Sequence, residues 1–240
     1  IGVRLVGSEM CIRDRCRRTD GTSLPSLSLP DRYLPFSSIG KSFAENNICE
    51  MGYAVSKIYA RSIIEEFSIR FDENIHCLED LLFMYQYLLH CDYLVLNHMQ
   101  NYVYVKHSFS LSHRIHSFES EYCCFVKYQQ LLAEMMKVWK IPAGDMVVTV
   151  NSMLVPFRRA LKSDYQPDRT IPREMRVKHL KRMISESRDV FLKYYHPVFK
   201  TDKLGKVLLG FNCYILYDFY IRLLFRLNIG PVFYGPKHMY

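Results

Sequence analysis

The sequence lacks the short motifs that would assign a function directly. It has no Walker-type phosphate loop, no Gly-x-Gly-x-x-Gly pattern and no Asp-x-Asp pair. Its eight cysteines include no Cys-x-x-Cys pair, which argues against a zinc site and favours the reduced cysteines of a cytosolic protein. The first fifteen residues have neither the long apolar core nor the small-residue cleavage site of a signal peptide.

Composition and charge describe a basic globular protein. Of its 240 residues, 49% are hydrophobic and 14% are aromatic, which excludes general disorder. The formal net charge of +8 predicts attraction to an anionic membrane surface or to phosphate-bearing substrates. We expect no nucleic-acid partner, because the sequence has no recognition helix, zinc spacing or aromatic RNA-binding motif.

Residues 1–51 are expected to be largely irregular. Residues 2–15 read GVRLVGSEMCIRDR, and the part VGSEMCIRDR resembles a translated sequencing adapter. We therefore expect residues 1–15 to be a leader that is not native, with no clean strand or helix. Pro25, Pro30 and Pro35 argue against a helix in residues 16–39, so we predict a loop there with one short extended piece. Residues 40–51 are expected to form a loop or strand that leads into the next stretch.

Residues 52–114 are the most informative stretch, because helical and extended patterns alternate in it. An apolar stripe that includes Ile58 and Tyr59 has helical spacing and predicts a helix around residues 55–67. Ile69 and Phe71 then alternate with polar neighbours, as in a short strand.

A second helix is predicted over residues 78–89, where apolar residues return to helical spacing. Glu79 and Asp80 lie in its first turn. Carboxylates are favoured at that position because the first amides of a helix are unpaired and the helix dipole is positive there. This preference explains the acidic pair without any catalytic role, and it also keeps the carboxylates ionised.

Five pieces of this stretch follow one another in a fixed order. They are Ser56-Lys57-Ile58-Tyr59-Ala60-Arg61, Arg70-Phe71-Asp72-Glu73, Glu79-Asp80 with Phe83, Tyr102-Val103-Tyr104-Val105-Lys106, and Ser110-Leu111-Ser112. In order and spacing they resemble the second half of a family-2 glycosyltransferase catalytic domain, of the kind that makes bacterial surface polysaccharides. The resemblance covers about a quarter of the chain.

The resemblance implies an inverting glycosyltransferase that moves a sugar from a nucleotide-sugar donor to a saccharide or lipid-linked acceptor. In such enzymes the aspartate of the acidic pair is the general base for the acceptor hydroxyl. Asp80 is therefore the implied base, and Glu79 orients it or binds acceptor hydroxyls. Lys57 is placed near the acceptor or diphosphate, and Lys106 against phosphate.

Each of these assignments has a plainer structural alternative. Lys57 also reads as a solvated lysine beside an apolar face. Lys106 stands where the family often has arginine, and a lysine offers a point charge instead of a fork of donors. Ser110 and Ser112, the remaining implied substrate-binding residues, also suit turn hydrogen bonds.

The resemblance also implies a divalent cation, Mg²⁺ or Mn²⁺, held by an Asp-x-Asp signature in the complete enzyme. That signature is absent from this sequence. We therefore expect the chain to carry the acceptor-side half of the domain, to lack the donor-binding half, and to be inactive as it stands.

Residues 115–240 are predicted to be mainly helical. The expected helices cover residues 117–139, a segment capped by Asp145 and kinked at Pro156, residues 172–185, residues 188–195 and residues 203–228. The helix at 172–185 carries a basic face that we expect to be solvated. Residues 207–217 are uncharged but too short to span a bilayer, so the last helix is predicted to lie in the core, or alternatively at a membrane interface.

The predicted fold class is α/β, with an incomplete GT-A-like domain at residues 16–114 and a mainly α-helical region at residues 115–240. The expected location is cytoplasmic, with peripheral contact to an anionic membrane left open. A non-catalytic helical interaction or membrane-docking module is the alternative function.

Overall fold

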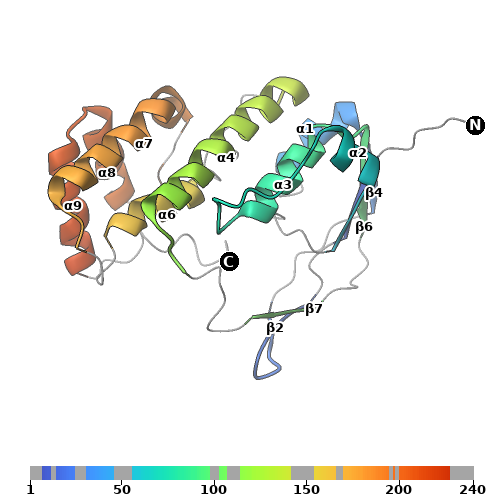
Figure 1. The fold of residues 1–240 in the computed structure, drawn as a ribbon, viewed down its shortest axis with the longest axis horizontal. Coiled ribbons are helices and arrows are strands. Elements are labelled where there is room, and N and C mark those ends of the chain that lie inside the picture. The colour runs from blue at the N-terminus through green and yellow to red at the C-terminus, as the bar shows by residue number, and fades with distance from the viewer. Residues whose placement is uncertain are drawn as a thin grey trace, which may run out of the picture. The chain divides into compact units, whose positions relative to one another are not determined.

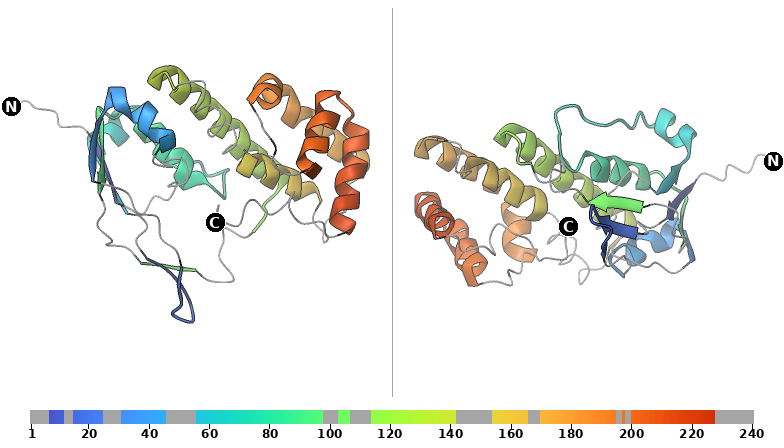
Figure 2. Two further views of the ribbon diagram at one scale, coloured as in Figure 1. Left: turned by 180° about the vertical axis from the view of Figure 1, so that it is seen from behind. Right: turned by 90° about the horizontal axis from the view of Figure 1, so that it is seen from below.

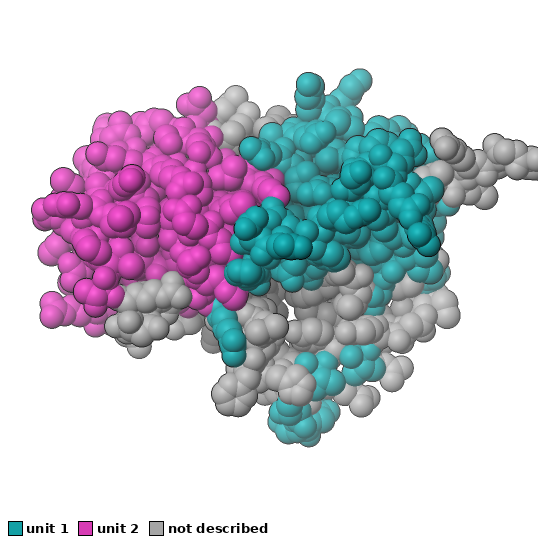
Figure 3. Space-filling view, viewed as in Figure 1, with its two compact units in different colours: residues 1–114, 130–145 teal, residues 115–129, 146–240 magenta. Residues whose placement is uncertain are grey.

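The computed structural model describes residues 7–11, 15–24, 31–45, 56–97, 103–106, 114–141, 154–165, 170–194, 197 and 200–227. The chain divides into two compact units, which Figure 3 distinguishes by colour. Unit 1 comprises residues 1–114 and 130–145, and unit 2 comprises residues 115–129 and 146–240. We describe each unit by itself.

Unit 1 contains two small sheets of mixed strand direction (Figure 1). The four-stranded sheet has the order β4-β6-β1-β5, formed by Arg32–Pro35, Tyr93–Asn97, Gly7–Cys11 and Lys57–Tyr59. Strand β1 runs parallel to β6 and antiparallel to β5, and β4 runs antiparallel to β6. The three-stranded sheet has the order β3-β2-β7, formed by Ser23–Leu24, Arg15–Arg18 and Val103–Lys106.

Three strand assignments correct the sequence analysis. Residues 16–39, expected to be a loop with one short extended piece, contain most of β2 and all of β3 and β4. Residues 57–59 form β5 instead of continuing a helix, and Ile58, which we placed on the buried stripe of that helix, is 62% exposed. Residues 7–11 form an inner strand, so the expectation of no clean strand in residues 1–15 is wrong for this part. The expectation that residues 1–15 are not native stays a prediction.

The helices of unit 1 are α1 (Phe36–Glu45), α2 (Arg61–Glu66), α3 (Glu79–Leu88) and the last part of α4 (Phe118–Trp139). Helix α3, with its acidic first turn, confirms the prediction for that segment. Helix α1 was missed, because its buried residues Ile39 and Phe43 are separated by Gly40, Lys41 and Ser42, which interrupt the apolar pattern. Pro35 directly precedes α1, a position where its fixed φ suits the entry into a helix.

The core of unit 1 lies between α1, α3, the sheet and the end of α4. Phe43 contacts the Tyr85 ring of α3 at 5.6 Å and the Trp139 ring of α4 at 5.5 Å between centroids. Helix α1 also packs on β4 and β6. Every residue of α3 from Leu81 to Leu88 except Gln86 is buried. This burial fixes α3, and with it the acidic pair at its first turn.

Residues 67–78 form a loop, and the predicted strand around Ile69 and Phe71 is absent from it. Ile69 is nevertheless buried, whereas Phe71 is half exposed. Arg70 donates hydrogen bonds to the carbonyls of Ile69 (2.7 Å) and Ile64 (3.3 Å). Because Ile64 belongs to α2, its carbonyl ties the loop to that helix.

Unit 2 is helical (Figure 2). It comprises the first part of α4, α6 (Leu154–Asp164), α7 (Arg173–Tyr194), α8 (Lys200–Gly210) and α9 (Tyr214–Arg226). Helix α4 confirms the prediction for residues 117–139. Pro156 lies in the first turn of α6 as described. Asp145 and the rest of the segment before α6, which was predicted to be kinked at Pro156, lie outside the described residues, so the kink stays a prediction. The two helices predicted at 172–185 and 188–195 are one helix, α7.

The helix predicted at residues 203–228 is interrupted between α8 and α9 by a Schellman motif. Asn212 adopts φ = 57°. The Asn212 amide donates to the Leu209 carbonyl (3.1 Å) and the Cys213 amide donates to the Leu208 carbonyl (2.8 Å). Arg188 of α7 donates a hydrogen bond to the Gly210 carbonyl (2.6 Å) and satisfies another acceptor at the end of α8.

Buried arginine–carboxylate pairs connect the helices of unit 2. Arg176 of α7 donates to both Asp218 oxygens of α9 (2.6 and 2.9 Å), and the Tyr165 hydroxyl donates to the same carboxylate (2.7 Å). Arg159 of α6 donates to both Glu121 oxygens of α4 (2.9 and 2.8 Å). The basic face of α7 is therefore not wholly solvated, since Arg176 is buried.

The Gly40→Ala variant tests the contact between α1 and α4. A Cβ at Gly40 would lie 2.6 Å from Trp139 Cβ and 2.7 Å from the Trp139 carbonyl oxygen, so the backbone must shift. We expect this overpacking to cost about 2 kcal/mol of unfolding free energy in urea titrations. Ser37→Ala, at an exposed position of the same helix, is the control and should leave stability unchanged or slightly higher. Equal stability of the two variants would contradict the close approach.

The Asp218→Asn variant tests the buried pair with Arg176. Burial opposes ionisation of Asp218, but the hydrogen bonds from Arg176 and Tyr165 outweigh it and lower the pKa of this carboxyl below its ordinary value. Its stabilising contribution is therefore present above about pH 4 and is lost as pH falls below that value. Removing the charge leaves Arg176 buried and uncompensated, so we expect a loss of about 3 kcal/mol at pH 7.

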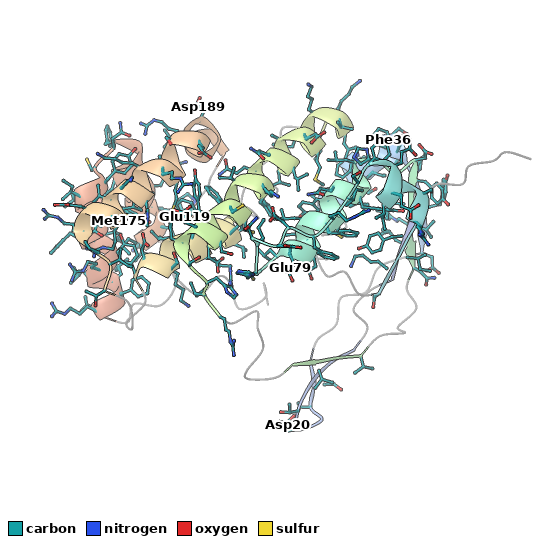
Figure 4. The ribbon with its side chains drawn as sticks, viewed as in Figure 1. Asp20, Phe36, Glu79, Glu119, Met175 and Asp189 are labelled. Carbon is teal, nitrogen blue, oxygen red and sulfur yellow. The ribbon has the colours of Figure 1, made fainter. Side chains whose placement is uncertain are left out.

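Urea unfolding at pH 7 and pH 3 measures this effect, with exposed Asp189→Asn on α7 as the control (Figure 4 labels Asp189). The difference in unfolding free energy between Asp218→Asn and the unmutated protein should be smaller at pH 3 than at pH 7. Burial raises the pKa of Asp164, and the nearby Asp218 charge adds to that rise. Asp218→Asn therefore also relieves Asp164 at pH 7, which makes the loss of stability at pH 7 smaller than the broken pair alone would give. A larger difference in unfolding free energy at pH 3 than at pH 7 would refute the stabilising role of ionised Asp218.

Candidate functional site

The acidic pair opens α3 after a residue with a left-handed backbone. Leu78 adopts φ = 65° and ψ = 13°, and its side chain makes no capping hydrogen bond. Asp80 Oδ1 accepts a hydrogen bond from the Leu81 amide at 2.8 Å, so this carboxylate satisfies one of the first unpaired donors of the helix. Figure 4 labels Glu79 at the start of α3.

Aromatic rings from β5, α3 and the loop 67–78 lie beside the acidic turn. The Tyr59 ring meets Phe83 and Tyr87 of α3 edge to face, at 5.4 and 4.8 Å between centroids. Phe71 stacks on Phe83 at 4.6 Å with 10° between the ring planes. Since Phe71 is 50% exposed, this cluster reaches the surface of unit 1.

Tyr59 couples this cluster to Asp80. Burial is the main cause that raises the pKa of the Tyr59 phenol far above its ordinary value, and the Asp80 carboxylate adds to the rise. The phenol is therefore a protonated donor at neutral pH. Its hydroxyl is buried and has no hydrogen-bond partner among the residues that the structure describes. A buried hydroxyl without a described partner is uncommon in folded proteins.

Ser56 provides a second hydroxyl of this kind. It adopts φ = 58°, and its buried Oγ finds no partner within the described parts of the chain. By contrast, the Tyr87 hydroxyl accepts a hydrogen bond from the Ala60 amide at 2.6 Å, so its role is structural. The segment 56–59 thus presents two hydroxyls whose hydrogen-bonding capacity is not used internally.

The structure places the predicted site residues in different parts of the chain. Glu79 and Asp80 share the first turn of α3. Lys57 lies two residues before Tyr59 in β5, and side chains two apart in a strand point to the same face, so Lys57 shares the face of Tyr59. Lys106 ends β7 in the other sheet. Ser110 and Ser112 lie outside the described residues, and the proposed roles of all six residues stay predictions.

Sequence reasoning missed the roles of Ser56, Tyr59 and Phe71 at this site. It assigned Tyr59 to the apolar stripe of a helix and Phe71 to a strand. The alternation of Lys57, Ile58 and Tyr59 was the available signal for a strand, but three residues are too few to outweigh a longer helical pattern. The side-chain partners of these hydroxyls depend on α3, which is distant in sequence.

The described residues do not fit a divalent cation. No group of three or more His, Cys, Asp or Glu side chains that could hold a metal ion occurs among them. We therefore derive no chemical step through a metal at this site.

Comparison with known proteins places the fold in a class. No protein-family model matches the sequence, and no curated protein matches it. The fold, mostly helical with small sheets, is similar to that of a glycosyltransferase domain.

Two similar solved structures are of S. aureus TarS residues 1–349. One, in complex with UDP-GlcNAc, has a TM-score of 0.58 at 13% identity, and the other has a TM-score of 0.52 at 13% identity. The first covers 93% of this chain, which in turn spans 60% of the TarS chain. At this identity the likeness concerns the fold alone.

A matched pair of variants tests the unequal roles of the two tyrosines. Tyr59→Phe removes a buried hydroxyl that has no described partner, so we expect no loss of unfolding free energy and a gain of up to about 1 kcal/mol. Tyr87→Phe deprives the Ala60 amide of its acceptor and should cost about 1 kcal/mol. Urea titration of both variants makes the comparison. A larger loss for Tyr59→Phe than for Tyr87→Phe would show that the Tyr59 hydroxyl has a structural partner.

Proposed function

We propose that this chain carries the acceptor side of an inverting, family-2 glycosyltransferase that acts in the synthesis of cell-surface polysaccharide. The observation that carries the proposal is the acidic turn of α3, which lies beside the buried, unused Tyr59 hydroxyl in a chain whose fold is similar to that of TarS. Carboxylates at a helix start are common, but such a turn beside an unpartnered buried hydroxyl is not.

Asp80 is proposed as the general base. Its carboxylate takes the proton of the acceptor hydroxyl while that oxygen bonds to the anomeric carbon of the donor sugar, and the bond from that carbon to the nucleotide diphosphate breaks. The positive end of the α3 dipole favours the ionised carboxylate before the reaction. A single direct displacement inverts the anomeric configuration and needs no second, nucleophilic carboxylate.

The neighbouring residues are proposed to bind and orient the acceptor. The Tyr59 phenol can donate to an acceptor hydroxyl or ring oxygen, which would complete its unused hydrogen-bonding capacity. Glu79, adjacent to Asp80, can accept hydrogen bonds from other hydroxyls. The half-exposed Phe71 ring offers a flat apolar surface against which the C–H face of a sugar ring can pack.

The donor is proposed to be a nucleotide sugar. TarS is solved with UDP-GlcNAc, and this chain spans 60% of that protein, so the donor and its Mg²⁺ or Mn²⁺ belong to the proposal for the complete enzyme. Lys57, on the same strand face as Tyr59, is proposed to meet the acceptor or the diphosphate, and Lys106, Ser110 and Ser112 keep their proposed substrate contacts. The acceptor is a saccharide or a lipid-linked saccharide at the cytoplasmic face of the membrane.

Asp80→Asn in the complete enzyme tests the proposed base. The product of the intact gene, with a divalent cation and a panel of nucleotide sugars, is assayed for release of nucleoside diphosphate and for glycosylated acceptor. We expect kcat to fall at least about 100-fold, because the amide cannot accept the proton. Asp92→Asn, an exposed aspartate in unit 1, is the control and should retain activity within about twofold. Unchanged kcat in Asp80→Asn would sink the assignment of the base.

Tyr59→Phe separates binding from chemistry in the same assay. If the phenol orients the acceptor, this variant should raise the KM for the acceptor more than it lowers kcat. An unchanged KM and kcat would remove Tyr59 from the site and leave Asp80 to be judged by its own variant.

A further inference from the structure

The outer face of α9 is apolar although it is exposed. Ile215, Leu216, Phe219, Leu223 and Leu227 are each 42–66% exposed. With about 100° per residue, positions i, i+1, i+4, i+8 and i+12 fall within one arc of the helix surface. The opposite side of α9, with Tyr217, Ile221 and Leu224, is buried. Helix α9 therefore has two apolar faces, one buried inside unit 2 and one exposed.

Helix α8 and the turn after it also carry exposed apolar side chains. Leu204 and Val207 of α8 are about half exposed, and Phe211 in the turn is 78% exposed. Helices α8 and α9 lie side by side in Figures 1 and 2, with Gly205 against the Tyr217 ring and the Tyr220 hydroxyl bonded to the Thr201 carbonyl at 3.1 Å. We call the exposed apolar residues of α8, α9 and the turn between them the α8–α9 surface.

The exposed charges of this segment all have one sign. Among the described residues 200–227, Lys200, Lys203, Arg222 and Arg226 are exposed and basic, and Lys206 is half-buried. The two acidic residues of the segment, Asp202 and Asp218, are buried in ion pairs with Arg158 and Arg176. Within residues 200–227, the α8–α9 surface therefore combines apolar side chains with basic ones, while Glu174 of α7, next to Arg173, is exposed and acidic.

A hollow of about 600 Å³ opens on this surface around the first turns of α9. Ile215, Leu216 and Phe219 line it together with the exposed guanidinium-bearing residues Arg173 and Arg222. Apolar walls next to two arginines match the boundary between the acyl chains and the phosphate headgroups of a lipid layer.

We propose that the α8–α9 surface docks unit 2 on an anionic phospholipid membrane. Leu216, Phe219 and Phe211 enter the headgroup region, and Arg173 and Arg222 contact lipid phosphates. Docking is peripheral, since no helix in the described parts of the chain is long and apolar enough to cross a membrane. A second copy of the chain is a poorer occupant, because a symmetric contact would place these basic side chains against one another.

Vesicle co-sedimentation with the full 240-residue chain tests the proposal. Binding to vesicles of phosphatidylcholine with about one third phosphatidylglycerol is compared with binding to phosphatidylcholine alone, at low and at physiological salt. We expect stronger binding to the anionic vesicles and a marked loss with salt. Arg173→Gln/Arg222→Gln should weaken partitioning into anionic vesicles about 25-fold, from a factor of about five for each arginine. Leu216→Ser/Phe219→Ser should weaken it on both kinds of vesicle.

Two control variants remove the same number of charges, or an exposed apolar side chain, from unit 1. Lys41→Gln/Lys137→Gln removes two exposed charges in unit 1, and Val138→Ser removes an exposed apolar side chain there. Both should bind vesicles like the unmutated chain, and far-UV circular dichroism should show that all variants are folded.

Three results would overturn the proposal. They are absence of binding to the anionic vesicles at low salt, equal loss of binding in the control and surface variants, and a self-association in sedimentation velocity that Leu216→Ser/Phe219→Ser abolishes. The last result would assign the α8–α9 surface to a second copy of the chain. The proposal stands apart from the glycosyltransferase assignment, because none of these measurements requires sugar transfer.

Discussion

The helical unit depends on the burial of charge in matched pairs. A carboxylate such as Asp218 cannot be buried alone without a large desolvation penalty, and Arg176 and Tyr165 together satisfy both of its oxygens. Glu121 and Arg159 repeat the arrangement between α4 and α6. These pairs specify which helices contact one another, because a bidentate pair tolerates little displacement.

The same ion pairs determine the sign of the exposed charges on α8 and α9. Since Asp202 and Asp218 are neutralised inside unit 2, the exposed charges of residues 200–227 are all basic. Because the buried carboxylates must be paired inside unit 2, the α8–α9 surface is left basic and apolar, which suits the proposed contact with anionic lipid. For an enzyme proposed to use lipid-linked acceptors, a lipid-facing surface and an acceptor site are chemically compatible features.

The candidate site in unit 1 differs from the buried ion pairs of unit 2, because some of its buried polar groups have no described hydrogen-bond partner. The buried core of α3 holds the acidic turn in place, while the Tyr59 and Ser56 hydroxyls keep hydrogen-bonding capacity that no described residue uses. The oxygen of Tyr87, whose ring contacts that of Tyr59, accepts a hydrogen bond from the Ala60 amide. This contrast separates a tyrosine hydroxyl with a backbone partner from one that has no partner among the described residues.

Local patterns in the sequence determined the long, regular elements: α3 and α4 follow from unbroken helical spacing, and the acidic pair at the start of α3 follows from the preference of carboxylates for that turn. Short or interrupted segments were decided by tertiary structure. Strand β5 exists because β1 pairs with it, and α1 is stabilised by Phe43 against Tyr85 and Trp139. Periodicity cannot reveal such partners, since it reports which face of an element is apolar and not what covers it. The burial of Arg176 against Asp218 and the packing of Tyr59 against Phe83 and Tyr87 were decided by residues distant in the chain.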